Sequence, residues 1–209
     1  DYFNNVTATS DGGFVAVGYS LSSSFGNGDW SGVAGKGDND TIIVKFNADG
    51  SVGWKKNFGG SGGDYFNGVT ATSDGGFVAA GGSWSNSFGN GDWSGVAGKG
   101  DDDAIIVKFD GNGDVVWKKN FGGSDYDYFW GVTATSDGGF VAAGYSWSDS
   151  FGNGDWSGVA EKGWEDAIIV KYDGSGNVVW KKNFGGSDYD EFWGVTATSD
   201  GGFVAAGYS

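Results

Sequence analysis

The sequence contains no cysteine, histidine, proline, methionine or arginine among its 209 residues. The absence of cysteine excludes disulfides, thiolate metal sites and cysteine redox chemistry. The absence of histidine removes the commonest general base and metal ligand, and with it the common forms of the nucleophile–base triad. We therefore expect the chain not to be an enzyme.

Positive charge is scarce as well. All 12 basic residues are lysines, against 27 acidic residues, so the formal net charge is −15. Nucleic acid and anionic membrane surfaces both attract clustered Lys or Arg, so neither is expected as a partner. No apolar run approaches the ~18 residues that a membrane-spanning helix needs. An acidic, glycine-rich and cysteine-free composition is instead typical of a bacterial extracellular or cell-surface protein.

What the sequence does contain is a 63-residue repeat. The phrase Asp-Tyr-Phe-Asn begins at Asp1 and at Asp64, and it becomes Asp-Tyr-Phe-Trp at Asp127 and Asp-Glu-Phe-Trp at Asp190. The expected units are repeat 1 (1–63), repeat 2 (64–126), repeat 3 (127–189) and a partial repeat 4 (190–209). Repeats 2 and 3 differ at only nine positions, so equivalent residues have similar surroundings. This near-identity argues against one specialised active site.

Repeat 2 predicts four β-strands and no helix. Its apolar and β-branched residues alternate or cluster over short segments, and glycine-rich turns such as Asp74-Gly-Gly separate them. The expected strands are 66–73, 77–83, 103–109 and 115–121. Four antiparallel strands repeated head to tail predict an all-β fold made of β-propeller blades, with the first strand at the centre and the lysine-bearing fourth strand at the outer edge. A β-trefoil is the alternative, and a β-solenoid fits less well.

Three motifs resemble the repeats of bacterial secreted and surface β-propeller proteins, of the seven-bladed-propeller-repeat and related types. The motifs are DGGFVAAGYS, DAIIVKFDGNGDVVWKKNFGGS and DYFWGV. They match the D-G-G/N turn, D-x-x-x-x-K strand, D-x-x-G turn and closing W…GG of those repeats, over every part of the unit except the long loop at 84–102. The resemblance implies a propeller in an extracellular or cell-envelope setting, usually without catalysis. Because a ring takes about 4–8 blades, we expect further repeats or self-association to complete this array.

Acidic residues recur at two places in the long loop. One set lies in the phrase F-G-N-G-D-W, and the other begins the third strand. The candidate ligands are Asp29, Asp92, Asp155, Asp40, Asp103 and Asp166. Oxygen ligands on a glycine-rich loop suit Ca²⁺, and an ordered loop of this length needs an explanation. Calcium is therefore a possible cofactor, and a hydrogen-bonded loop is the alternative. The turn at 110–114, with D-x-N-x-D spacing, offers a second calcium candidate or an ordinary Asx turn.

The same loop carries repeated tryptophans and asparagines. The candidate ligand-binding residues are Trp30, Trp93, Trp156, Asn27, Asn90 and Asn153. Exposed indole rings beside amides are typical of carbohydrate-binding sites. The alternative is that the tryptophans form a small core that folds the loop onto its blade. Two functions follow. The first is a non-catalytic structural or adhesive repeat protein that assembles through its blades. The second is a multivalent, lectin-like protein that binds glycans.

Overall fold

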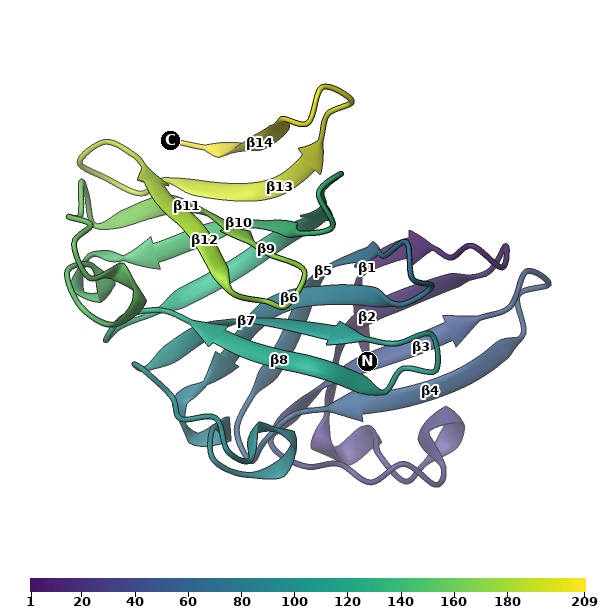
Figure 1. Cartoon of the computed structure of the whole chain (residues 1–209). Coiled ribbons are helices and arrows are strands. Elements are labelled where there is room, and N and C mark those ends of the chain that lie inside the picture. Colours follow the sequence, from purple (N-terminus) through teal and green to yellow (C-terminus); the bar gives the residue numbers. More distant parts are fainter.

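The computed structural model describes residues 1–209 and consists of β-sheets arranged like a fan (Figure 1). Each complete repeat forms one four-stranded antiparallel sheet whose strands follow the order of the chain, and the partial repeat forms a two-stranded sheet. The strands are β1 (Tyr2–Ala8), β2 (Phe14–Leu21), β3 (Asn39–Phe46), β4 (Val52–Phe58), β5 (Asp64–Ala71), β6 (Phe77–Trp84), β7 (Asp102–Phe109), β8 (Val115–Phe121), β9 (Asp127–Ala134), β10 (Phe140–Trp147), β11 (Glu165–Tyr172), β12 (Val178–Phe184), β13 (Glu191–Ala197) and β14 (Phe203–Tyr208). The predicted all-β, blade-like fold is confirmed.

The predicted strand limits are close to the observed ones. The fourth strand of repeat 2, β8, has the predicted limits, while β6 and β7 are each one residue longer than expected. The first strand, β5, lies two residues nearer the N-terminus than predicted, because Asp64 already pairs with Ser83 of β6. The long loop contains two 3₁₀ turns, η3 (Ser85–Ser87) and η4 (Gly91–Trp93), and the other repeats have their equivalents. None of these helices has the length and apolarity needed to cross a membrane.

The first strands of successive repeats lie side by side at the narrow side of the fan. Strand β5 contacts β1 and β9, and β9 contacts β13. This approach requires small residues: a Cβ atom added to Gly68 would lie 3.0 Å from the Cα of Gly131. The fourth strands form the outer edges, so the predicted order from centre to edge is confirmed.

The hydrophobic core lies between the sheets rather than within one repeat. Val15, Val17 and Ile43 of the first sheet pack against Phe66 and other apolar residues of the second sheet, and all of them are buried. A second cluster joins the second and third sheets in the same way. Inner strands such as β7 are buried along nearly their whole length, which explains the continuous apolar run of Ile, Ile and Val in the sequence.

Candidate functional site

The three loop tryptophans that the sequence nominated for ligand binding lie in the interior. The exposed fraction is 0% for Trp93 and Trp156 and 6% for Trp30. The indole of Trp93 packs edge to face on Phe58 of the preceding repeat, with a centroid distance of 4.9 Å. The expectation that these rings are exposed stacking surfaces is therefore corrected, because Trp93 and Trp156 fill the interface between a loop and two sheets, and Trp30 packs between its loop and the first sheet. The alternative interpretation, a small core that folds the loop onto its blade, agrees with this packing.

A buried aspartate holds the loops of repeats 2 and 3 in place. In repeat 3, Oδ1 of Asp127 accepts hydrogen bonds from Ser146 and from Nε1 of Trp156 (2.9 Å). Its Oδ2 accepts from the backbone N–H of Gly123 (2.9 Å) and from Oγ of Ser150 (2.8 Å). Asp64 makes the same four contacts in repeat 2. This node joins the loop, the first two strands and the end of the preceding repeat. Burial raises the pKa of Asp127 to about 6, although its hydrogen bonds oppose the shift.

This shifted pKa predicts that the protein is more stable at pH 5 than at pH 7. Because the folded state holds the proton of Asp127 more tightly than the unfolded state, stability falls as pH rises toward the folded pKa. Between pH 5 and pH 7 the change from Asp127 alone should be about 1 kcal/mol. Burial raises the pKa of Asp64 in the same direction, and no histidine titrates in this window. Thermal unfolding at both pH values checks this, and a higher midpoint at pH 7 would contradict it.

The three loop asparagines stabilise the loop backbone. Nδ2 of Asn90 donates to the carbonyls of Asn86 (3.1 Å) and Phe88 (3.3 Å). Asn27 and Asn153 make the equivalent contacts within their own repeats. These amides are thus engaged in the loop itself, and the structure does not bring them beside an exposed ring of Trp30, Trp93 or Trp156.

The candidate calcium ligands are distributed among separate polar contacts. Asp92 forms an ion pair with Lys36 of the preceding repeat at 2.5 Å, Asp155 pairs in the same way with Lys99, and Asp29 is exposed. Buried Asp103 accepts hydrogen bonds from two backbone N–H groups of its loop and from Asn120, as Asp40 and Asp166 do in their repeats. Nowhere do three acidic side chains converge closely enough to hold a metal ion.

The turn at 110–114 has the geometry of an Asx turn, which was the alternative to a calcium site. Oδ1 of Asp110 accepts hydrogen bonds from the backbone N–H groups of Asn112 and Asp114, both at 2.9 Å. The carboxylate of Asp114 points to Lys56 of the preceding repeat, with a distance of 2.6 Å between the charged atoms. The turn is therefore an Asx turn whose second acid links neighbouring repeats.

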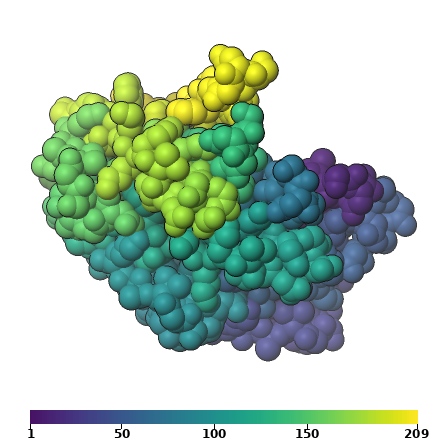
Figure 2. Space-filling view, in the orientation of Figure 1, coloured from purple at the N-terminus to yellow at the C-terminus, as the bar shows by residue number.

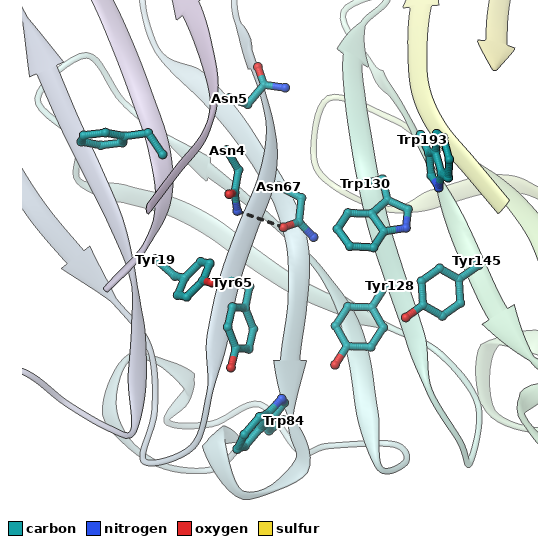
Figure 3. A pocket seen from close by; sticks show the side chains of 11 residues that line it. Asn4, Asn5, Tyr19, Tyr65, Asn67, Trp84, Tyr128, Trp130, Tyr145 and Trp193 are labelled. Carbon is teal, nitrogen blue, oxygen red and sulfur yellow. Dashed lines mark hydrogen bonds between the residues drawn. The ribbon is translucent and has the colours of Figure 1, made fainter. Parts of the chain in front are cut away.

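The innermost strands form a groove that the sequence did not reveal. We call it the aromatic groove; it has a volume of about 930 Å³ and 11 lining residues, eight of them hydrophobic. It follows the innermost strands across all four repeats (Figure 3). Four of its residues occupy one position of the repeat: Asn4, Asn67, Trp130 and Trp193.

A β-bulge in each first strand places these four residues in the groove. In repeat 2, Phe66 pairs with Gly81 and Gly68 pairs with Ala80, so Asn67 is the extra residue between them. Trp130 and Trp193 are the extra residues of β9 and β13. A bulge re-aims a side chain out of the regular alternation of a strand. It also explains a recurrent glycine, since a Cβ atom on Gly81 would lie 1.8 Å from the carbonyl oxygen of Tyr65.

Two groups of rings flank the asparagines of the groove. On one side, Tyr19 and Tyr65 are in edge-to-face contact at 4.9 Å. On the other side, Tyr128 stacks on Tyr145 at 5.5 Å, and Trp130 lies 6.2 Å from Tyr145. Figure 3 shows Asn4 and Asn67 between the two groups, joined by a hydrogen bond of 3.2 Å. The groove therefore alternates aromatic faces with amides.

Polar groups outside the groove fix the orientation of its rings. Oε2 of Glu191 accepts hydrogen bonds from Nε1 of Trp130 (3.1 Å) and of Trp193 (2.7 Å). The hydroxyl of Tyr128 donates to Asp102, and burial together with this carboxylate raises the pKa of Tyr128 far above its ordinary value. The ring faces are thus held in place and the Tyr128 phenol stays neutral. Such preorganisation lowers the entropic cost of binding a ligand.

The groove lies where the repeats differ. Of the nine differences between repeats 2 and 3, one replaces Asn67 by Trp130 and another replaces Gly82 by Tyr145. Gly82 leaves space for the ring of Tyr128, because a Cβ atom there would lie 2.2 Å from that ring. These differences were the available signal in the sequence. They do not mark the groove by themselves, because the other seven differences, Asp101 to Trp164 among them, lie outside it.

Comparisons with known proteins do not assign this chain to a family. No family model and no curated protein matches it. A solved structure of a protein of unknown function from Bacteroides caccae is similar over 87% of this chain and 67% of that chain, with 13% sequence identity and a TM-score of 0.26. A likeness at this level carries no argument about function. The description as repeated, blade-like antiparallel sheets rests on the strand order of the chain itself.

Proposed function

We propose that this chain is a non-catalytic structural or adhesive repeat protein of the bacterial cell exterior, whose end blades pack against further copies of the same repeat, which a second copy of the chain can provide. One observation supports the proposal. Apolar residues that are buried against the preceding sheet in the second repeat have equivalents in the first repeat, and there they are exposed on the outward face of the first sheet. Val6 is 58% exposed, whereas its equivalent in repeat 2, Val69, is 7% exposed. Phe14 is likewise exposed, and its equivalent Phe77 is buried.

The opposite end of the array carries the complementary face. Phe184 of β12 is exposed, while its equivalents in repeats 1 and 2 are buried against the next sheet. Figure 2 shows the half repeat (yellow) at the top of the molecule and the first repeat (purple) at the right and lower right, with the other repeats between them. A contact that joins one end to the opposite end of another copy is heterologous, and such contacts produce either a closed ring or a filament. Both outcomes agree with a structural or adhesive role.

The absence of catalysis and the extracellular setting are parts of the same proposal. The chain has no histidine or cysteine, and the buried carboxylates of Asp64 and Asp127 each accept four hydrogen bonds that tie the loop to the sheets. They therefore serve the fold. The extracellular setting is supported by the acidic composition and by the resemblance of the repeat to secreted and surface propeller proteins.

Assembly predicts a concentration-dependent increase in mass that one substitution abolishes. In Val6→Asp, a charge lies on the face that packs against the second copy, and its burial is unfavourable. We expect the wild-type chain to sediment as a dimer or larger species at micromolar concentrations, and the variant to sediment as a monomer. The control is Val116→Asp, since Val116 is 56% exposed but lies on the outer strand β8 of the middle sheet, away from both end faces. A wild-type chain that stays monomeric at every concentration would refute the assembly.

A further inference from the structure

The aromatic groove has no charged residue in its lining, although the chain carries 27 acidic and 12 basic residues. The two acids nearest to it, Glu191 and Asp102, already accept hydrogen bonds from the groove rings. A phosphate, a uronic acid or a polycation would therefore meet no opposite charge in the lining. This chemistry selects a neutral ligand.

The remaining groups of the groove match the two surfaces of a sugar. A pyranose ring has an apolar face of C–H groups and a rim of hydroxyls. The faces of Tyr65, Trp130 and Tyr145 can cover the former. Oδ1 of Asn4 and Nδ2 of Asn5 make no hydrogen bond within the protein, so an acceptor and a donor remain for hydroxyls. We propose that the aromatic groove binds a neutral oligosaccharide.

The size and the asymmetry of the groove define the ligand further. Its volume of about 930 Å³ lies near the upper end of the range for small-molecule sites, so it takes an oligosaccharide rather than a single sugar. Its rings come from different repeats and are not equivalent: repeat 2 has Asn67 and Gly82 where repeat 3 has Trp130 and Tyr145. The groove is one composite site, and it binds one ligand per chain.

A proline-rich peptide is the competing occupant, because such peptides also dock in aromatic grooves. Peptide carbonyls need hydrogen-bond donors beside the rings, and indole N–H and phenol O–H groups are the donors that Trp and Tyr provide. In this groove the N–H groups of Trp130 and Trp193 donate to Glu191, and the hydroxyl of Tyr128 donates to Asp102. Oδ1 of Asn4 is an acceptor with no partner in the protein, and a proline residue has no N–H to offer it. Sugar hydroxyls can both donate to this oxygen and accept from the free Nδ2 of Asn5, which favours the sugar.

The repeats themselves provide the test variants. Trp130→Asn and Tyr145→Gly introduce the residues that repeat 2 has at the same positions, where the sheet forms with them. Trp164→Asp is the matched control, because it also introduces the repeat 2 residue and removes a tryptophan, but Trp164 is an exposed residue outside the groove. Circular dichroism and melting of each variant show whether it is folded, and the single variant Trp130→Asn replaces the double variant if the latter does not fold.

The experiment is calorimetric titration of the full chain with cellohexaose, maltohexaose and chitohexaose, with a polyproline peptide as comparator. We expect at least one hexasaccharide to bind with one ligand per chain. The double variant should weaken that binding at least tenfold, while Trp164→Asp should leave it unchanged. The proposal is overturned by no hexasaccharide binding at millimolar concentration, by equal binding of the double variant, by three or more ligands per chain, or by binding of polyproline alone. Because β1 holds both Val6 and groove residues, the titration is repeated with the Val6→Asp variant, and sugar binding that persists there is independent of assembly.

Discussion

Replacing Phe121 by alanine is expected to lower the free energy of unfolding by about 3–5 kcal/mol, the usual cost of deleting a buried phenylalanine. Phe121 is 1% exposed and lies in the interface between the second and third sheets. Its ring is edge to face with Trp156 at 4.9 Å and lies 6.0 Å from Phe129, both of the next repeat. The loss therefore measures packing between blades. Equilibrium unfolding in urea gives the difference.

Phe184→Ala is the matched control for this prediction. Phe184 has the same place in repeat 3 and the same strand neighbours within its sheet, but it is 63% exposed. In the unassembled chain, for which the Val6→Asp background can be used, its replacement should cost less than about 1 kcal/mol, as surface substitutions do. Phe58→Ala, at the equivalent buried position of repeat 1, should behave like Phe121→Ala. Equal losses for Phe121→Ala and Phe184→Ala would contradict an interface that stabilises the array.

The sequence predicts the strands of this protein well because their determinants are local. The turn Asp74-Gly75-Gly76 shows why: Gly75 has a φ of 85°, which favours glycine, and Asp74 accepts a hydrogen bond from the backbone N–H of Gly76. The limits of β8 follow from a similar turn and an apolar run. By contrast, the burial of Trp93 depends on a hydrogen bond to Asp64, which precedes it by 29 residues, and on packing against Phe58 of the preceding repeat. Contacts of this kind leave no periodic pattern in the sequence.

The aromatic groove was missed for a related reason. Its residues Tyr65, Trp130 and Trp193 belong to three repeats and come together only because the first strands converge. The bulge adds a second obstacle, since it turns Asn67 and its equivalents out of the alternation that predicts which face a residue occupies. Near-identity of the repeats suggested several equivalent sites, whereas the few differences between them produce one asymmetric site. In a repeat protein, the differences between copies should therefore be examined together with the motifs when a site is predicted from the sequence.

Asp127→Asn should destabilise the protein by about 3 kcal/mol, because an amide cannot replace this carboxylate. Each oxygen of Asp127 accepts one N–H that cannot reverse its role: Nε1 of Trp156 donates to Oδ1, and the backbone N–H of Gly123 donates to Oδ2. In either orientation, the NH₂ group of asparagine would face one of these donors. The serine hydroxyls can rotate, but the indole and the backbone cannot. Urea unfolding measures the loss, and Asp64→Asn should reproduce it.

The half repeat supplies the control for this second prediction. Asp190 is the equivalent of Asp127, but its only side-chain hydrogen bond is between Oδ2 and the backbone N–H of Gly186 (2.8 Å), and its Oδ1 has no partner. Asparagine at this position can keep its oxygen toward Gly186 and place its NH₂ where no donor opposes it. Because an unpaired NH₂ would replace an oxygen that is already unpaired, Asp190→Asn should cost less than about 1 kcal/mol although Asp190 is buried. A small loss for Asp127→Asn, or an equal loss for both variants, would show that the four donors do not hold the loop to its blade.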